Sequence, residues 1–179
     1  YFCGSGTSYH VALFAKYLLP KVTGVMVEPM VASESRFLSD LIIPDSVFVS
    51  ISQSGESADV LESSEMARDR GAKTLSIVNS MTSTLAHESE ISIPLNCGPE
   101  IGVAATKSFT SQLAIIYRIA DRLTDGKIAP NFEELSDMIK QFLESNNIER
   151  LAKRLRHSQS IYVLGRGIHY PIAKEGALK

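Results

Sequence analysis

The segment Tyr1-Phe2-Cys3-Gly4-Ser5-Gly6-Thr7-Ser8 sets the pattern of the chain, because it leads from an apolar strand through a glycine turn into a helix. The residues that follow, as far as Leu19, are almost wholly apolar and predict that this helix is buried. Further along, short β-branched or aromatic runs alternate with longer helical patterns, which is typical of parallel βαβ units. The sequence therefore predicts an α/β protein with a five-stranded parallel sheet flanked by helices.

The predicted elements follow one another in regular alternation. The strands are expected at Tyr1–Cys3, Val25–Val27, Val47–Ser50, Thr74–Val78 and Ile91–Leu95. The helices are expected at Ser8–Leu19, Asp59–Arg70 and Ala104–Leu123, with one or two surface helices in Phe132–Leu155 and a new strand at Ile161–Leu164. Apolar residues at three- or four-residue steps give the helix at Ala104–Leu123 a single apolar stripe, which we assign to the core.

The composition is that of an ordinary globular protein. The 179 residues are 44% hydrophobic and 21% charged, and their formal net charge is −2. A chain without a positive field is not a general polyanion binder, so we expect no nucleic-acid partner. Its apolar stretches fall far short of the ~20 residues that cross a bilayer, and no charged-then-apolar leader is seen, so we expect no membrane partner.

Cysteine and histidine are too sparse to suggest a metal site or a disulfide framework. Cys3 and Cys97 lie in apolar segments with no second Cys or His at ligand spacing, and we expect both to be reduced in a cytoplasmic protein. The histidines have no partners at catalytic spacing, and we expect each to be exposed or hydrogen-bonded within the fold. They are His10, His87, His157 and His169.

An internal repeat is visible at an offset of 161 residues. It places Gly165-Arg166-Gly167 on Gly4-Ser5-Gly6, with matching Tyr and Ala residues further on, each time between an apolar run and a helical pattern. We therefore expect a first subdomain at residues 1–125, a helical connector at 126–159 and the start of a second copy at 160–179. Because the chain begins and ends inside predicted elements, we expect it to be a piece of a longer protein.

Two loops are expected at the carboxyl edge of the sheet, where parallel sheets bind ligands. Gly4–Ser8 follows the first strand and Ser52–Ser57 follows the third, and each combines glycine with hydroxyl side chains before a helix. Glycines, helix N-termini and Ser or Thr hydroxyls together suit a phosphate. Capping of the two helices by these hydroxyls is the alternative. A dinucleotide site is less favoured because Tyr9 replaces the third glycine, and no Walker-type Gly-Lys-Ser/Thr occurs.

Two further sets of residues leave their roles open at this point. Pro99–Lys107 leads into a long helix and could form a third wall of the crevice, although Lys107 itself is more simply a solvated side chain. Glu175 and Lys179 are four residues apart and share a helix face, as either a weak surface pair or a functional pair.

These motifs closely resemble the SIS (sugar isomerase) domains of the glutamine:fructose-6-phosphate aminotransferase family. The resemblance spans the chain in order. It rests on Gly4–Tyr9, Ser52–Asp59, Glu100–Lys107, Leu164–Gly167, Tyr170–Ala173 and Glu175–Lys179, with Val31–Phe37 fitting the segment after the second strand. It implies a flavodoxin-like three-layer sandwich and two SIS subdomains, of which this chain holds the first and the opening of the second.

The resemblance also implies roles for single residues. Positions matching the sugar-phosphate ligands are Ser8, Ser52, Gln53, Ser54 and Ser57, and positions lining the sugar are Ser5, Gly6, Thr7, Val103 and Ala105. Glu175 and Lys179 match isomerase active-site residues, the lysine helping to position the open-chain sugar. Ser5, Ser57 and Ala105 depart from the common Cys, Thr and Ser, and the last change removes a donor beside the sugar.

The activity implied is conversion of fructose 6-phosphate and glutamine-derived ammonia into glucosamine 6-phosphate, without metal or other cofactor. The implied partners are a glutaminase domain of the same protein and a second copy in a homodimer. The proton-moving carboxylate and the ring-opening histidine are implied beyond Lys179, so we expect these residues alone to bind a sugar phosphate without turnover. Glucosamine-6-phosphate deaminases, fructosamine-phosphate deglycases and sugar-phosphate-sensing regulators with SIS domains remain alternatives.

Overall fold

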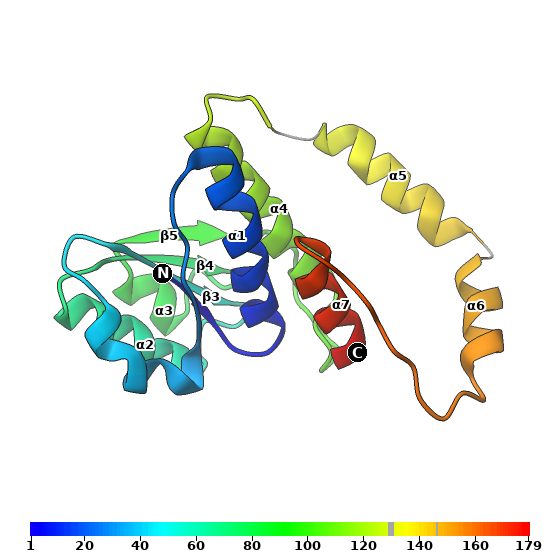
Figure 1. The fold of residues 1–179 in the computed structure, drawn as a ribbon, viewed down its shortest axis with the longest axis horizontal. Coiled ribbons are helices and arrows are strands. Elements are labelled where there is room, and N and C mark those ends of the chain that lie inside the picture. The colour runs from blue at the N-terminus through cyan, green and yellow to red at the C-terminus, as the bar shows by residue number, and fades with distance from the viewer. Residues whose placement is uncertain (129–130, 146) are drawn as a thin grey trace.

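The computed structural model describes residues 1–128, 131–145 and 147–179. The strands are β1 (Phe2–Gly4), β2 (Pro29–Val31), β3 (Val47–Ser52), β4 (Lys73–Val78) and β5 (Ile91–Pro94). The helices are α1 (Thr7–Thr23), η1 (Ala32–Leu41), α2 (Ala58–Asp69), α3 (Thr84–Glu88), α4 (Lys107–Leu123), α5 (Phe132–Glu144), α6 (Asn147–Leu155) and α7 (His169–Leu178). The strands form one parallel sheet in the order β2-β1-β3-β4-β5, as expected (Figure 1).

The sheet is covered on both faces, which gives three layers. Alternate side chains of β3 point to opposite sides, so Phe48 packs toward α2 and Val49 toward α1 and α4. The α1 and α4 side contains Val11, Ile51 and Ile116, all fully buried. Because both faces are covered, the strands are near-continuous apolar runs in the sequence. This is why the predicted bounds of four strands lie within two residues of the observed bounds.

The second strand lies at Pro29–Val31, and its predicted position at Val25–Val27 is wrong. Helix α1 continues past Leu19 to Thr23, and Gly24 ends it in a left-handed conformation with φ of 73°. The chain needs the next residues to return to the sheet, where Met30 pairs with Cys3 and is buried. Helix α4 similarly begins later than predicted, at Lys107.

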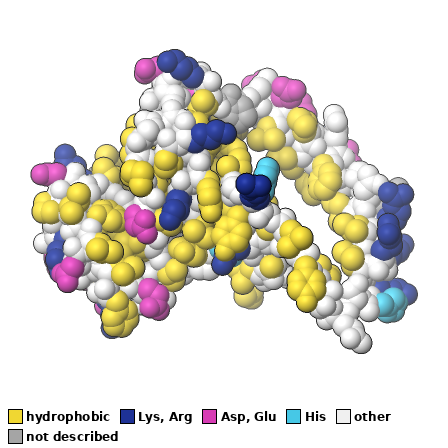
Figure 2. All heavy atoms as spheres, in the orientation of Figure 1, with side chains coloured by type: hydrophobic (Ala, Val, Ile, Leu, Met, Phe, Trp, Pro, Cys, Tyr) yellow, Lys and Arg dark blue, Asp and Glu magenta, His cyan; other side chains and the backbone are white. Residues whose placement is uncertain are grey.

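Residues after α4 form two surface helices, as predicted, but no strand follows them. None of the described residues of α5 and α6 is buried, and hydrophobic side chains gather over α5 in Figure 2. The predicted strand at Ile161–Leu164 is wrong, because within the described parts of the chain no strand pairs with it. Tyr162 and Leu164 are accordingly exposed.

The glycines of the two turns Gly4–Ser8 and Gly165–His169 play matching roles. Gly6 and Gly167 have φ of 53° and 59°, a region that favours glycine. A Cβ atom at Gly4 would lie 2.8 Å from the carbonyl carbon of Ser8, and one at Gly165 would lie 2.2 Å from the carbonyl oxygen of His169. Because Gly4 and Gly165 have no side chain, the first turn of the following helix can pack directly against each of them. This likeness agrees with a repeat, and the domain boundaries stay a prediction.

Helices α1 and α7, which follow these turns, pack against each other (Figure 1). Their contact brings the end of the chain to the first turn. Of the helices described, none is long and apolar enough to cross a membrane.

Candidate functional site

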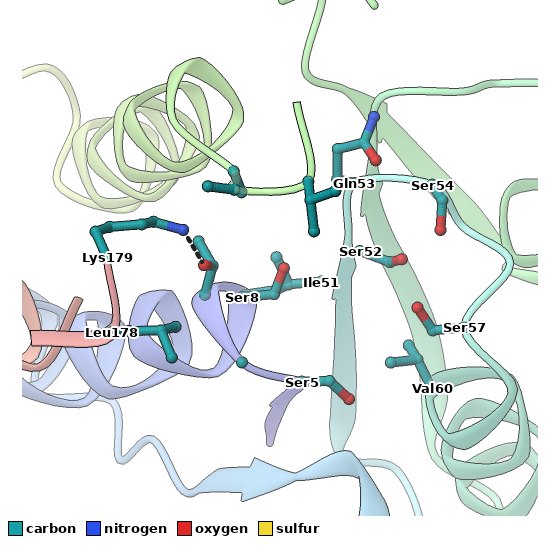
Figure 3. A pocket seen from close by; sticks show the side chains of 15 residues that line it. Ser5, Ser8, Ile51, Ser52, Gln53, Ser54, Ser57, Val60, Leu178 and Lys179 are labelled. Carbon is teal, nitrogen blue, oxygen red and sulfur yellow. Dashed lines mark hydrogen bonds between the residues drawn. The ribbon is translucent and has the colours of Figure 1, made fainter. Parts of the chain in front are cut away.

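A pocket of about 550 Å³ opens at the carboxyl edge of the sheet (Figure 3). The loops after β1 and β3, the loop before α4 and the end of α7 surround it. Every candidate from the sequence except Glu175 lines it, namely Ser5, Gly6, Thr7, Ser8, Ser52, Gln53, Ser54, Ser57, Val103, Ala105 and Lys179. The two hydroxyl-rich loops therefore converge on one cavity, as parallel strands predict.

The loop after β1 points the start of α1 at this pocket. Gly6 occupies the N-cap position with φ of 53° and ψ of −121°, a conformation that glycine adopts readily and other residues rarely do. No side chain among the described residues caps the helix, and the Thr7 and Tyr9 amides have no carbonyl partner there. The hydroxyl of Ser8 accepts a hydrogen bond from Gln112 Nε2 at 3.0 Å, which ties this loop to α4.

The loop after β3 is held in shape by its own hydroxyls. Ser52 Oγ accepts from the Gly55 amide at 2.9 Å, and Ser54 Oγ accepts from the Glu56 amide at 3.2 Å. A hydroxyl that accepts still has a proton to donate, so both side chains keep a donor for a ligand. Gly55 has φ of 72°, and a Cβ atom there would lie 2.1 Å from Ser83 Oγ, so this position requires glycine.

The capping alternative is not what the structure shows for α2. Ser57 occupies the N-cap position, yet its hydroxyl makes no capping hydrogen bond. Among the described residues, the first-turn amides of Ala58 and Asp59 have no carbonyl partner. Figure 3 shows the hydroxyls of Ser52, Ser54 and Ser57 on the same side of the pocket as this helix start. Free amides and hydroxyls together form a donor-rich wall suited to an anion.

A third wall comes from the loop between β5 and α4, which carries Val103 and Ala105. Glu100 closes this loop, because its carboxylate accepts from the Thr106 amide and hydroxyl, both at 3.0 Å, and from the Ser108 amide at 3.2 Å. Burial raises the pKa of Glu100, but the hydrogen bonds from Ser108 and Thr106 lower it to about 2. Sequence reasoning missed this role.

Charge at the pocket is concentrated in one lysine. Lys179 is the only cationic side chain that lines the cavity in the described parts of the chain, whereas Lys107 is exposed outside it. Lys179 Nζ lies 3.0 Å from Glu175 Oε1 and donates to Thr7 Oγ1 at 3.2 Å. The side of the pocket formed by the loop after β3 and the start of α2 therefore offers neutral donors, and the Lys179 ammonium lies on the opposite side (Figure 3).

Glu175 is a buried residue, so its interpretation as part of a surface pair is wrong. It is 5% exposed and accepts from Thr7 Oγ1 at 2.9 Å and Lys179 Nζ at 3.0 Å. His10 Nδ1 lies 2.7 Å from its second oxygen. Burial raises the pKa of Glu175, but the hydrogen bonds from His10, Lys179 and Thr7 outweigh it and leave the pKa below its ordinary value.

His10 is buried and hydrogen-bonded to Glu175, in agreement with the prediction of a histidine that is either exposed or hydrogen-bonded within the fold. Its partner lies 165 residues away in sequence, so no local spacing could reveal the pair. The one available signal was its place on the same face of α1 as Thr7, three residues earlier.

Comparison with known proteins places this architecture in a family. The SIS domain profile matches residues 1–121. The chain belongs to the SIS domain family. It is 40% identical over 187 aligned residues to glutamine–fructose-6-phosphate aminotransferase (isomerizing) of Pyrobaculum aerophilum, covering 100% of this chain and 31% of the relative. It is 38% identical over 184 to that of Thermotoga maritima, covering 97% and 30%.

Solved structures agree on the fold of this SIS chain. The C-terminal domain of glucosamine-fructose-6-phosphate aminotransferase from Francisella tularensis matches with a TM-score of 0.82 and 34% identity, over 99% of this chain and 53% of that one. Glucosamine-6-phosphate deaminase from Thermotoga maritima matches with a TM-score of 0.75 at 23% identity, over 99% of this chain and 55% of that one, and shows the fold alone. The chain spans about a third of the length of the curated relatives.

Proposed function

We propose that this chain is the isomerase part of an enzyme that makes glucosamine 6-phosphate from fructose 6-phosphate and glutamine-derived ammonia. A glutaminase domain of the same protein would release the ammonia. The observation that carries the proposal is one pocket with a wall of neutral donors on one side and the Lys179 ammonium on the other. The aminotransferase relatives support this reaction over a deaminase, whose likeness extends to the fold alone.

The phosphate of the sugar would bind on the loop after β3 and the start of α2. Ser52, Ser54 and Ser57 have hydroxyl protons to donate, and Gln53 lines the same wall. The unpaired amides of α2 add positive partial charge, so the dianion needs no lysine or arginine there. Ser8 and the first turn of α1 would bound the phosphate from the other loop.

The carbon chain of the sugar would extend from this wall toward Lys179, along Ser5, Gly6 and Thr7 and past Val103 and Ala105. Lys179 has three N–H donors, of which Glu175 and Thr7 receive two. We propose that the third donates to a sugar oxygen near the reacting carbons of the open chain. Glu175, one turn earlier, would hold the ammonium in place.

Calorimetry of fructose 6-phosphate binding tests the phosphate wall. Ser54→Ala removes one hydrogen bond to a charged group, worth ~1.5–3 kcal/mol, so affinity should fall about tenfold to a hundredfold. Ser33→Ala on η1 is the matched control, because Ser33 is exposed and does not line the pocket. Unchanged affinity in a folded Ser54→Ala variant would contradict the proposed binding mode.

We further propose that the protein works in the cytoplasm as a homodimer. Both cysteines are free, which agrees with a reducing compartment. Exposed apolar side chains on α5 and α6, such as Phe142 and Leu151, provide surface that association would bury. Sedimentation of the full-length protein tests the second statement, and a monomer at micromolar concentration would contradict it.

A further inference from the structure

The buried carboxylate of Glu175 is held from two helices. Thr7 on α1 and Lys179 after α7 donate to Oε1, and His10 Nδ1 on α1 lies 2.7 Å from Oε2. Among the residues that the structure describes, His10 is the only partner of Oε2. The orientation of the carboxylate therefore depends on His10 at one oxygen and on Thr7 and Lys179 at the other.

The proton of the His10–Glu175 hydrogen bond belongs to the imidazole. The pKa of Glu175 lies below its ordinary value because its three donors outweigh the effect of burial, so the carboxyl group is ionised at neutral pH. An ionised carboxylate can only accept, and Nδ1 must then be the donor. His10 is 7% exposed and does not line the pocket, so a ligand in the pocket would meet Lys179 and not the imidazole.

We propose that His10 is a positioning residue for the isomerase reaction: its Nδ1–H fixes Glu175, and Glu175 fixes the Lys179 ammonium at the sugar. The inference rests on the proposed function, because it requires Lys179 to contact the substrate. Lys179 has a flexible side chain at the end of α7, and its side chain is 29% exposed. A fixed counter-ion therefore decides where its remaining N–H points, and small errors in such placement slow reactions strongly.

Two substitutions of His10 separate the hydrogen bond from the packing. His10→Asn keeps an N–H donor close to the place of Nδ1, whereas His10→Leu keeps an apolar side chain of similar size and removes the donor. In the full-length enzyme, we expect His10→Leu to lower kcat about tenfold and to change KM for fructose 6-phosphate less than about threefold. We expect His10→Asn to keep kcat within about threefold of the unsubstituted enzyme.

Val11→Ala is the matched control for packing. Val11 is fully buried on the next position of α1, and its aliphatic side chain has no donor for the Glu175 carboxylate. We expect it to lower the melting temperature without lowering kcat. A purely structural role for His10 would instead make kcat follow the melting temperature across all three variants, and that result would overturn the proposal.

Lys179→Ala distinguishes failure of this inference from failure of the proposed function. Loss of turnover in Lys179→Ala together with full turnover in His10→Leu overturns the role of His10 alone. Full turnover in Lys179→Ala overturns the contact of Lys179 with the sugar, on which this inference rests, whereas no glucosamine 6-phosphate from the unsubstituted full-length enzyme would overturn the proposed function itself.

Histidine NMR of the unsubstituted protein gives a second test that does not depend on a folded His10 variant. We expect a protonated Nδ1 on His10 whose slowly exchanging proton signal shifts or disappears in Glu175→Gln. A His10 whose Nδ1 lacks the proton, with the proton on Nε2 alone, overturns the proposal.

Discussion

The turns Gly4–Ser8 and Gly165–His169 have two glycines of similar conformation and packing but differ in chemistry. In both, the first glycine allows close approach of the following helix and the second has positive φ. The first turn carries hydroxyls at positions 5, 7 and 8, where the second carries Arg166, Ile168 and His169. Only the first turn lines the pocket. Glycines therefore set the shape of the turn, and the side chains between and after them decide whether it can bind an anion.

The segment that follows the second turn contributes to the same pocket by another route. Its helix α7 packs on α1 and delivers Lys179 to the cavity, with Glu175 buried behind it. The first turn thus supplies neutral donors, and α7, the helix after the second turn, supplies the charged groups. Four predictions test this division.

The largest effect should come from Lys179→Ala in the full-length enzyme. Turnover should fall by at least about a hundredfold, because a group oriented at the reacting carbons is lost. Calorimetric affinity for fructose 6-phosphate should change by less than about threefold, because the phosphate wall lies on other elements. Lys174→Ala, an exposed lysine of the same helix, should leave both unchanged. Equal losses in turnover and affinity would contradict the division.

Gly6 and Gly167 are the second glycines of the two turns. Substituting either one should lower folding stability by a similar amount, but only one of the substitutions should weaken ligand binding. Gly6→Ala and Gly167→Ala each place a Cβ at positive φ, at a cost of about 1–3 kcal/mol of folding free energy. Only Gly6→Ala should weaken fructose 6-phosphate binding, by about tenfold or more, because Thr7 and Ser8 follow it. Urea unfolding and calorimetry measure the two effects, and equal binding losses in the two variants would refute the comparison.

Thr7→Val makes the first turn chemically like the second at one position, where Ile168 is the counterpart. The hydroxyl that donates to Glu175 and accepts from Lys179 is lost while the β-branched shape stays. Because this hydroxyl holds the Lys179–Glu175 pair, we expect turnover to fall about tenfold, with affinity for fructose 6-phosphate changed by less than about threefold. Thr23→Val, at the far end of α1, is the control and should leave turnover unchanged. A Thr7→Val variant with full turnover would argue against a polar role for this residue.

The smallest effect concerns Glu100, on the loop between β5 and α4. Its pKa is about 2 in the folded protein and 4.5 in the unfolded reference, so the folded state binds its proton less readily. Its contribution to stability is therefore present above about pH 4.5 and is lost as the pH falls toward about 2. In Glu100→Gln, unfolding midpoints should depend less on pH across this window. An identical pH dependence in both proteins would contradict the capping role.

Much of the fold and of the pocket wall could be predicted because both follow from local patterns. Apolar runs mark the strands, and parallel strands bring the residues after them to one edge, which placed Ser52–Ser57 beside Gly4–Ser8. The second strand was misplaced because Val25–Val27 has the stronger β pattern. Its true position depends on where Gly24 ends α1 and on pairing with β1.

Other features could not be predicted because they depend on contacts distant in sequence. Ile161–Leu164 has a strand pattern, but a strand needs a neighbour, and the described chain places none beside it. The His10–Glu175 pair requires α1 to meet α7. Glu100 reaches forward to cap α4, and only the folded loop shows which acid does so.

A crystal structure of the full-length protein with fructose 6-phosphate would show directly where the phosphate binds. We predict phosphate oxygens within hydrogen-bond distance of the hydroxyls of Ser52, Ser54 and Ser57 and of the first amides of α2, with the carbon chain toward Lys179. Phosphate bound at the second turn, beside Arg166, or a sugar that leaves this pocket empty, would contradict the account.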